Sequence, residues 1–549
     1  DPTTRCKKFI GIHVAGGGTY GMCSLFPGKV DVVAEAQDNH VPRTMVKIGE
    51  VERQPGGSGQ SAIRKSPLHG KWGPAQKEPA KLVPFKNKEG ERVSPMKRAL
   101  DRYDQPILKF DEQIVKIAVR AAIAENVPGL AKKVSMEEAI QGIPGVPFME
   151  SLKRSTSPGY PWNMNPRTGF KGKERFFGKG PEIELNGPDW ELLKEDINKA
   201  HDLLRNGERP DFFFCDALKD ELLKMEKAEK GDTRMFCPSP IVYQILFGIY
   251  FKDLLRLMMD TRLRTEHAVG TNVYSEEWEK LFRKLTVFGP DNIVAGDFKT
   301  FDALQAAQIL KEIGEQLLLC FEDREYDNIR RLLWMEVWNS RHVVGKEIFE
   351  WKQSLPSGHP ATTLINCLYV ATIMRMCWIH IHNDDMMSVR EFVKHVKLIV
   401  YGDDNALGVS DEKKDIFNQW TIAEAMSFFG QKYTAENKED DPPKLRSIYD
   451  IEFLKRTFRY EPRLGRHVAP LRMATIVEMP YWTKKEGYDE IWRDNFDNAL
   501  KELSLHPPEK FEERASEMLA RASEAGHFPL IIDRNTLVDE ITNSENLYH

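Results

Sequence analysis

The stretch KLIVYGDDNALGV, residues 397–409, places two short apolar runs on either side of a Gly-Asp-Asp-Asn turn. Two such runs around a tight turn predict a β-hairpin, with the carboxylates of Asp403 and Asp404 at its tip. Adjacent like charges cost free energy unless a cation neutralises them, and Mg²⁺ prefers hard oxygen ligands. The dipeptide alone also fits a solvated, Asp-rich turn.

A second stretch, NIVAGDFKTFD at residues 292–302, predicts a strand that ends at Asp297, with Asp302 five residues further on. A carboxylate at a strand end can face the tip of a neighbouring hairpin. Asp297 and Asp403 could then hold two Mg²⁺ ions about 4 Å apart, the spacing that in-line phosphoryl displacement uses. One ion would lower the pKa of an attacking 3′-hydroxyl, and the other would stabilise the leaving pyrophosphate.

A third stretch, SGHPATTLIN at residues 357–366, is a Ser-Gly loop that leads through Pro360 into a predicted helix. Thr362 and Asn366 lie four residues apart, so they share one helical face. Read alone, the stretch also fits a capped helix whose two polar groups are satisfied locally.

The bulk properties limit the class of protein. A length of 549 residues predicts several subdomains. A net charge of -5 excludes a basic, histone-like protein, so any positive charge for nucleic acid must be local. The seven cysteines include no CxxC pair, which argues against a zinc site or a disulfide framework and favours free thiols in a reducing compartment. The N-terminus shows no signal peptide, and the apolar stretch 364–379 predicts a buried helix rather than a membrane span.

Composition changes along the chain predict its organisation. Residues 1–30 look β-rich, and the Gly-rich stretch 51–61 is typical of a linker. Apolar helices alternate with carboxylate-bearing strands from about residue 236 to 455. The remainder is expected to be mostly helical, with amphipathic stretches near 488–505 and 509–525.

Together the motifs resemble the palm of viral RNA-dependent RNA polymerases of the picornavirus-like lineage, and they keep that family's order. The five matching motifs are Asp297-x4-Asp302, Ser357-Gly358-x3-Thr362-x3-Asn366, Tyr401-Gly402-Asp403-Asp404, the stretch 433–438 and the hairpin 453–456. The resemblance implies an α+β, multidomain right-hand fold with an antiparallel-sheet palm and a mostly helical thumb. It implies fingers over 62–240, with a later segment near 265–290, a palm over 241–455 and a thumb over 456–549.

The family's roles carry over by position. Asp297, Asp403 and Asp404 would be metal ligands, and Lys438 would be the general acid that protonates pyrophosphate. Read alone, Lys438 also fits an exposed lysine in a charged loop. Ribose recognition falls to Asp302, Thr362, Asn366 and Ser357, triphosphate binding to Lys219, Lys227 and Arg234, and template or primer contacts to Thr156, Ser157, Pro158, Gly159, Lys455 and Arg456.

Two basic regions depend on the resemblance for their interpretation. Composition alone would make residues 219–234 a solvated helix face or an i,i+4 ion-pair ladder, since five basic residues are matched by five acidic ones. The family usually has a basic residue where Leu223 stands, and Lys224 is a candidate substitute. Basic side chains also flank the template loop and could meet template phosphates: Lys153, Arg154, Arg167, Lys171, Lys173 and Arg175.

The N-terminal stretch Gly11–Gly16 resembles the last strands of the chymotrypsin-like cysteine protease that precedes such polymerases, with His13 at the position that lines a Gln pocket. Residues 1–50 would then be a protease-like remnant without protease activity. Gln54 or Gln60 would lie near a processing junction. The combination resembles iflaviruses and dicistroviruses.

The preferred hypothesis is an RNA-directed RNA polymerase with two Mg²⁺ ions, with Mn²⁺ as their substitute. The expected partners are template and product RNA, NTPs, a small genome-linked protein primer and other viral replication proteins, in the host cytoplasm at membrane-associated replication complexes. A reverse transcriptase is one alternative, although that class usually has a bulky aromatic residue where Asp302 stands. A non-catalytic, RNA-binding scaffold is the other.

Overall fold

The computed structural model describes residues 11–17, 20–25, 43–56 and 59–543, and the chain divides into two compact units, residues 1–42 and 43–549. In the first unit, strands β1 (Gly11–Gly17) and β2 (Tyr20–Leu25) pair as an antiparallel hairpin, which confirms the β-structure expected there. The predicted role of the His13 side chain lies outside the described residues.

The second unit begins eight residues before the boundary expected from the linker. Strand β3 (Met45–Glu50) pairs with β14 (Glu347–Trp351) in a four-stranded sheet that also contains β13 (Arg341–Val344) and β8 (Phe214–Cys215). These ladder hydrogen bonds attach residues 45–50 to the larger unit, so the remnant assigned to residues 1–50 is longer than the first unit. Within residues 51–56 and 59–61 no helix or strand forms, as the linker composition predicts.

A second four-stranded sheet carries the acidic motifs. Its order is β15 (Val396–Tyr401), β16 (Asp404–Val409), β12 (Ile293–Lys299) and β17 (Lys432–Ala435), and every neighbouring pair is antiparallel. The β15–β16 pair is the hairpin that the sequence predicts. This sheet confirms the antiparallel palm.

Both faces of the palm sheet are covered, which explains why its strands read as nearly continuous apolar runs. Leu398 and Val400 join the core that includes α11 (Thr362–Ile381), whereas Ile399 between them joins the core of α8 (Glu277–Leu285). The period of two places successive side chains on opposite faces. The sheet is therefore held rigidly between helices.

Helix α11 is the central element of the core. It is long and apolar enough to cross a membrane by length and composition, but 89% of its apolar 18-residue stretch is buried inside the protein. It packs on α2 (Glu112–Asn126), α13 (Gln419–Phe428) and β15. Buried Arg375 donates to both carboxylate oxygens of Glu266, so the charge that interrupts the apolar run is paired. The buried helix expected over residues 364–379 is confirmed.

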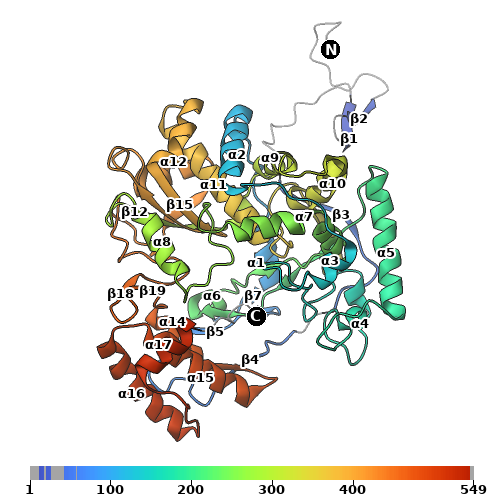
Figure 1. Cartoon of the computed structure of the whole chain (residues 1–549). Helices are drawn as coiled ribbons and strands as arrows, with labels where there is room; N and C mark the ends of the chain where they lie inside the picture. Colours follow the sequence, from blue (N-terminus) through green and yellow to red (C-terminus); the bar gives the residue numbers. More distant parts are fainter. Residues whose placement is uncertain (1–10, 18–19, 26–42, 57–58, 544–549) are drawn as a thin grey trace. The chain divides into compact units, whose positions relative to one another are not determined.

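Further helices extend this core in Figure 1. Helix α7 packs against α3 and α10, and α9 packs against α2 and α10. Their bounds are α1 Pro95–Asp101, α3 Met136–Gln141, α4 Glu174–Phe177, α5 Pro188–Arg205, α7 Ile241–Asp260, α9 Ala307–Leu318, α10 Asp327–Trp338 and α12 Phe392–His395.

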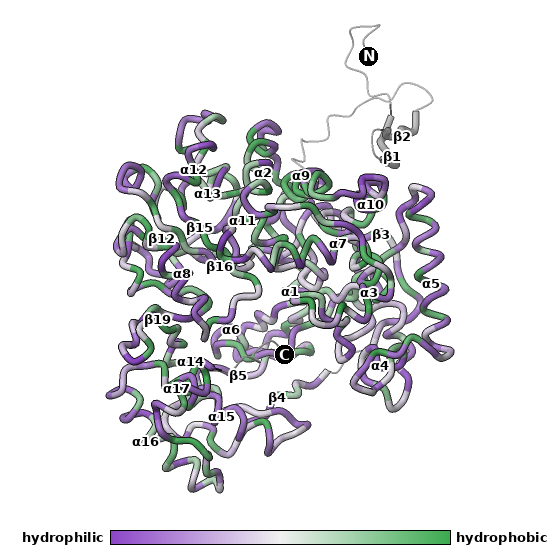
Figure 2. Tube along the Cα trace, in the orientation of Figure 1, coloured by the Kyte–Doolittle hydropathy of each residue, from purple (hydrophilic) through white to green (hydrophobic). Residues whose placement is uncertain are grey.

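The C-terminal region is mostly helical, as expected, and its helices gather at one end of the second unit in Figure 1. They are α14 Met473–Glu478, α15 Tyr488–Ser504, α16 Pro508–Glu524 and α17 Arg534–Asn543, with the hairpin β18 (Arg459–Glu461) and β19 (Arg466–Val468) before them. Hydrophobic and hydrophilic residues alternate along α15 and α16 in Figure 2, which confirms the two amphipathic stretches.

An N-terminal strand joins this helical region. Strand β4 (Ile63–Lys65) pairs with β20 (Trp482–Lys484), and Leu68 is buried among the residues of α15 and α16. The next strand, β5 (Lys77–Pro79), pairs instead with β10 (Leu222–Lys224). The start of the expected fingers segment therefore connects the C-terminal helices to the region around residues 219–234.

That region is not one helix. It contains β9 (Ala217–Leu218), β10, the short α6 (Met225–Glu229) and β11 (Met235–Phe236), so the helix-face alternative suggested by composition is wrong. A further hairpin, β6 (Phe85–Lys86) with β7 (Arg92–Val93), lies earlier in the chain. Strands β9 and β11 pair with each other, which brings the two ends of the basic segment together.

Candidate active site

The palm sheet brings Asp297 and Asp403 to the same edge. Gly296 is opposite Asn405, and Tyr401 is opposite Asp404, so Asp297 on β12 lies beside the two-residue turn that holds Asp403. Burial raises the pKa of Asp403, and the charge of Asp297 raises it further. Asp297 can act on Asp403 in this way only because the two carboxylates lie close together in space, as the sequence predicts.

Asp404 completes the acidic group. Burial, followed by the charges of Asp403 and Asp297, raises the pKa of Asp404 to about 6. Three hard oxygen donors that repel one another suit divalent cations such as Mg²⁺, which relieve the repulsion. The donor set therefore fits the metal ions that the motifs imply.

Lys438 contacts this group. Its Nζ lies 3.3 Å from Oδ2 of Asp297, and its side chain is 57% exposed. The residue follows β17 with a positive φ of 62°, and its backbone N–H donates to the carbonyl of Ala435. Lys438 is therefore exposed, as the alternative of a lysine in a charged loop expects, and its amine also lies beside the Asp297 carboxylate.

Asp302, Asn366 and Ser357 form a second polar group. Nδ2 of Asn366 donates to Oδ1 of Asp302 at 3.5 Å, and the Ser357 hydroxyl also bonds this carboxylate. Burial and the charge of Asp403 raise the pKa of Asp302 to about 6, against the opposing effects of Asn366 and Arg234. The structure therefore brings together three of the four residues expected to read the ribose.

Thr362 is the exception. As the first residue of α11, it donates from Oγ1 to the carbonyl of His359 at 2.8 Å and to that of Pro356 at 3.3 Å. The local-capping alternative therefore describes Thr362 but not Asn366, whose amide points to Asp302.

The expected triphosphate residues are partly assembled. Pairing of β9 with β11 places Lys219 beside Arg234, whose carbonyl accepts from the Lys219 N–H at 2.8 Å. Both side chains approach Glu221, which forms a bidentate pair with Arg234 and lies 3.8 Å from Lys219 Nζ. Glu221 raises the pKa of Arg234 most, and Asp403 and Asp302 add to it, so this guanidinium faces the acidic site. Lys227 is exposed on α6.

Packing explains why residue 223 is a leucine and not the expected basic residue. Its side chain is buried with Ala80 and Ala228, beneath the β10–β5 pair. Lys224, the next residue, is exposed, as strand alternation requires. A basic side chain at 223 would be buried in this small apolar cluster.

The template loop lies against the start of α7. The N–H of Ile241 donates to the carbonyl of Pro158 at 2.8 Å, and Thr156 Oγ1 donates to the carbonyl of Lys153 at 3.0 Å. Gly159 has a φ of 70°, and a Cβ there would lie 2.7 Å from the Ser239 carbonyl oxygen. Ser157 accepts at Oγ from the Gly159 N–H. The four residues 156–159 therefore form one constrained turn.

Several basic residues that flank the loop are enclosed or ion-paired within the protein. Lys173 is 1% exposed and donates to Thr156, and burial lowers its pKa to about 8. Arg167 and Arg175 both pair with Asp189. The expectation that this whole set meets template phosphates is wrong for Lys173, because its amine is enclosed.

The hairpin at residues 453–456 places its two basic residues in different environments. Lys455 lies at the tip with a φ of 61°, and its charge lowers the pKa of Asp404, so it faces the site. Arg456 is 9% exposed and donates to both oxygens of Glu502, at 2.7 and 2.8 Å, and to the Tyr274 hydroxyl. The primer contact expected of Arg456 is therefore corrected: this side chain joins the hairpin to α15.

Sequence reasoning missed a network behind the carboxylates. The Tyr433 hydroxyl donates to Oδ1 of Asn405 at 2.8 Å, and Nδ2 of Asn405 donates to the carbonyls of Gly296 and Asp403. Sγ of Cys367 accepts from the Gly402 N–H at 3.2 Å. A glycine within a strand signals close approach of another group, and Gly296 is the one feature of this network that the sequence could have revealed.

A buried His–Asp–Cys group lies outside this site. Ligand atoms of Asp216, Cys237 and His342 are within 4.8 Å of one another. However, the two ring nitrogens of His342 are 2.7 Å from Asp216 Oδ1 and 2.7 Å from Ser340 Oγ. Both nitrogens are already engaged at hydrogen-bond distance, so the group is a hydrogen-bonded chain and not a metal site.

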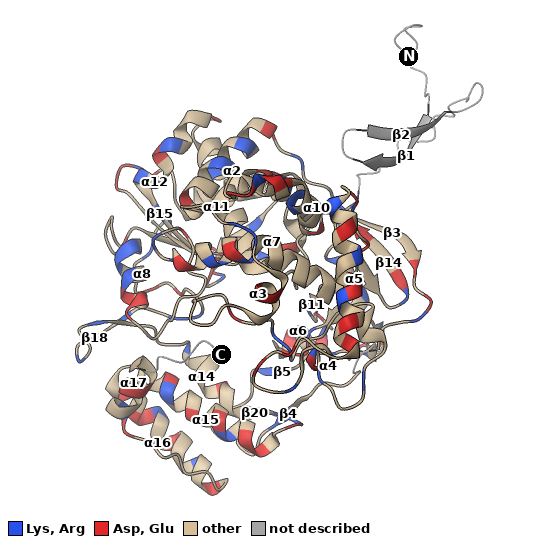
Figure 3. Cartoon of the chain, turned by 45° about the vertical axis from the view of Figure 1, so that its right-hand side comes forward, with Lys and Arg blue, Asp and Glu red and all other residues tan. Residues whose placement is uncertain are grey.

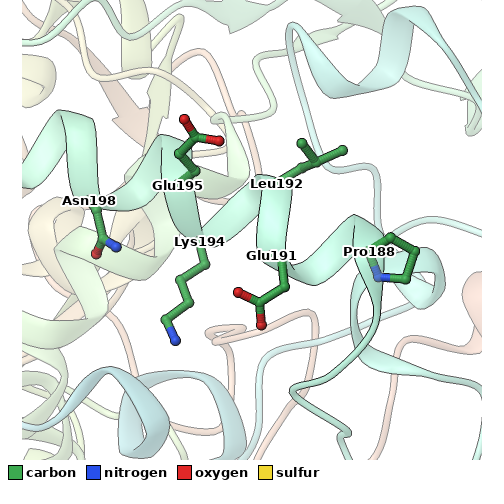
Figure 4. A pocket seen from close by; sticks show the side chains of 6 residues that line it. All are labelled: Pro188, Glu191, Leu192, Lys194, Glu195 and Asn198. Carbon is green, nitrogen blue, oxygen red and sulfur yellow. The ribbon is translucent and has the colours of Figure 1, made fainter.

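One hollow on the outer surface lies away from the acidic group. A shallow hollow on α5, shown in Figure 4, is lined by Pro188, Glu191, Leu192, Lys194, Glu195 and Asn198. Both signs of charge follow one another along this helix in Figure 3. None of the residues with expected roles lies there.

Comparisons with known proteins identify the family of the chain. Residues 73–523 match the family model "Viral RNA-dependent RNA polymerase". The chain is 33% identical over 500 residues to the replicase polyprotein of Acute bee paralysis virus (strain Rothamsted), covering 87% of this chain and 26% of that protein. It is 32% identical over 517 residues to the replicase polyprotein of Drosophila C virus (strain EB), covering 90% and 29%.

The fold has a solved counterpart, the "Sicinivirus 3Dpol RNA dependent RNA polymerase", with a TM-score of 0.76, 20% identity, and coverage of 91% of this chain and 100% of that one. This likeness confirms the right-hand fold. The chain spans between a quarter and a third of the two replicase polyproteins described above. By its matched sequence over most of its length, the chain belongs to the viral RNA-dependent RNA polymerase family.

Proposed function

We propose that this chain extends an RNA primer on an RNA template by two-metal nucleotidyl transfer. The convergence of Asp297 on β12 and Asp403 in the β15–β16 turn carries the proposal, because a divalent-ion pair requires carboxylates from both sides. The ions, Mg²⁺ with Mn²⁺ as a substitute, would activate the primer 3′-hydroxyl and stabilise the pyrophosphate formed when the Pα–O bond breaks.

The chain's own residues position the reactants. Asp297, Asp403 and Asp404 would hold the ions, and Arg234 with Lys219 would bind the triphosphate once Glu221 releases them. A guanidinium fork suits bidentate phosphate contacts. Lys227 on α6 joins them in the proposal as a third contact. The loop 156–159 and Lys455 would guide template and primer.

Lys438 is proposed as the proton donor to pyrophosphate. Its amine is 3.3 Å from Asp297, so it reaches the place where charge develops on the leaving group. Donation at this point converts a poor leaving group into a better one, and general acid catalysis of this kind contributes about 10²–10⁴-fold.

Asp302 and Asn366, supported by Ser357, are proposed to read the ribose 2′-hydroxyl. A site built for hydrogen bonds rejects a substrate that lacks the hydroxyl, because buried polar groups then stay unpaired. This pair favours RNA synthesis over reverse transcription. The assembled carboxylates and Lys438 favour an enzyme over a non-catalytic scaffold.

The wider setting is also proposed. The relatives are polyproteins, so the chain would act beside other viral replication proteins. A small genome-linked protein as primer and membrane-associated replication complexes in the host cytoplasm complete the hypothesis. The assignment of fingers to 62–240 and 265–290, palm to 241–455 and thumb to 456–549 is proposed with it, together with the protease-like remnant.

Primer extension on a defined RNA template tests the function. Asp403→Asn should abolish Mg²⁺-dependent extension while RNA affinity stays within about twofold, since a single metal ligand contributes little to backbone binding. Asp415→Asn, which changes an exposed carboxylate, is the matched control and should extend normally. Extension by Asp403→Asn at the control's rate would refute the metal assignment, and incorporation of dNTPs as readily as rNTPs would favour a reverse transcriptase.

A further inference from the structure

Gln305 is a buried amide that the proposed mechanism leaves unused. It directly follows the short 3₁₀ helix Asp302–Leu304, and its side chain is fully buried. Its Nε2 donates to Oδ1 of Asn366 at 2.7 Å. Its own Oε1 has no hydrogen-bond partner in the part of the chain that the structure describes. Burying the Gln305 oxygen without a partner costs free energy. A glutamine at this position therefore needs an explanation beyond packing.

The backbone around Gln305 is fixed from several sides. Its carbonyl accepts from the Ser354 N–H at 3.0 Å, and the Ala306 N–H donates to the Tyr369 hydroxyl at 3.0 Å. Nε2 of Gln431 donates to the carbonyl of Leu304 at 2.9 Å. Tyr369 lies on α11, the same helix that carries Asn366. The amide of Gln305 is therefore held at a constant position relative to Asn366.

This position decides which end of the Asn366 amide faces the ribose site. An asparagine has an accepting oxygen and a donating NH₂. Gln305 presents a donor to it, and the Asp302 carboxylate presents an acceptor. Both contacts are satisfied only with Oδ1 toward Gln305 and Nδ2 toward Asp302. Rotating the Asn366 amide by half a turn would oppose two oxygens on one side and two NH₂ groups on the other.

We propose that Gln305 determines sugar specificity through Asn366, by holding the Asn366 NH₂ toward the 2′-hydroxyl of an incoming ribonucleotide. The inference rests on the proposed function and adds a positioning residue to it. With Gln305 in place, one N–H of the Asn366 NH₂ group donates to Asp302, and a 2′-deoxynucleotide leaves the other N–H without an acceptor. Without Gln305 the Asn366 amide can rotate, so its NH₂ group is no longer oriented before the nucleotide binds. The hydrogen bond to the 2′-hydroxyl then contributes less binding free energy.

Single-nucleotide incorporation by the full-length chain tests this, with ATP and 2′-deoxyATP compared on one template in Mg²⁺. Gln305→Met keeps the length of the side chain and removes both polar atoms. It should reduce the ATP preference, as the ratio of kpol/Kd values, by about tenfold, the effect of about one well-oriented hydrogen bond. The loss should come from ATP, with 2′-deoxyATP changed by less than about twofold.

Gln431→Met is the matched control. Gln431 is also a buried glutamine, and it supports the same backbone without touching Asn366. It should lower the melting temperature comparably and leave the sugar preference within about twofold, because a general loosening does not rotate the Asn366 amide. A merely structural role for Gln305 would make the two variants alike.

A double-mutant cycle completes the test. If Gln305 acts through Asn366, then Gln305→Met should change the sugar preference no further in an Asn366→Ala background. Gln305→Glu, nearly isosteric, offers Asn366 only acceptors and should also lose the preference, which keeps the test informative if the Met variant folds poorly. An unchanged preference in either folded variant, or an equal loss in the Asn366→Ala background, overturns the inference. Failure of the wild-type chain to incorporate ATP would instead refute the proposed function itself.

Discussion

Replacing Gly296 by alanine should damage both stability and catalysis, because there is no space for the added methyl group. A Cβ at this position would lie 1.9 Å from Cζ and from the hydroxyl oxygen of Tyr433. Ordinary contact begins near 3.4 Å, so the ring would have to move by about 1.5 Å. The ring is enclosed against Phe298, with ring centroids 4.9 Å apart.

The magnitude follows from two losses. Overpacking of a buried strand costs about 1–3 kcal/mol. Moving the ring also breaks the bond from Tyr433 to Asn405, and leaving that buried acceptor unpaired costs about 1–3 kcal/mol more. We therefore expect Gly296→Ala to lower the free energy of unfolding by about 2–6 kcal/mol. Tyr433→Phe, which keeps the ring and incurs only the second loss, should cost about 1–3 kcal/mol.

Urea denaturation followed by circular dichroism measures the first effect, and rapid-quench extension measures the second. Because Asp297 follows Gly296 directly, a shift near 1 Å should slow extension by about 10²-fold. A free energy of unfolding of Gly296→Ala within about 0.5 kcal/mol of the wild-type value would refute the close approach of Tyr433. So would a Tyr433→Phe protein as unstable as Gly296→Ala.

Three further predictions concern charged residues. The raised pKa of Asp404, about 6, means that its ionised form costs stability above that pH. Asp404→Asn should therefore raise the melting temperature of the metal-free protein at pH 8, with a gain that shrinks between pH 6 and 4; an equal gain at pH 8 and pH 4 contradicts this. Arg456→Met should lower the free energy of unfolding by about 3–5 kcal/mol, because Glu502 is left buried and unpaired; urea denaturation showing no loss would restore a primer role. Lys438→Met should slow extension by about 10²–10⁴-fold with RNA affinity unchanged, and a rate within threefold of wild type in rapid-quench experiments would exclude it as the proton donor.

The sequence predicts the strands and the turn that carry the candidate site, because the signals of these elements are local in the chain. Apolar runs flanking Gly402 and Asp403 specify a hairpin, and the apolar run before Asp297 specifies its neighbour β12, which continues past the predicted end at Asp297 to Lys299. The buried helix over residues 364–379 follows in the same way, from composition and length. These elements carry their own period and turn signals, so tertiary contacts only reinforce them.

Other features depend on distant partners and could not be predicted. Arg456 resembles a primer contact until α15 supplies Glu502, 46 residues away. The pairing of β3 with β14 joins segments about 300 residues apart, so the second unit begins at residue 43, eight residues before the expected linker. Gln305 meets Asn366 across 61 residues. Each case turns on a contact that no local pattern encodes.

The central claim is that Asp297 and Asp403 share a pair of divalent ions, and anomalous scattering from Mn²⁺ tests it most directly. Crystals of the chain with template, a primer lacking its 3′-hydroxyl and a matched NTP should show two peaks about 4 Å apart. Carboxylate oxygens of Asp297 and Asp403 should lie between about 2.0 and 2.3 Å from these peaks. Mn²⁺ bound elsewhere, or carboxylates of residues 297 and 403 that share no ion with the bound NTP, would contradict the account.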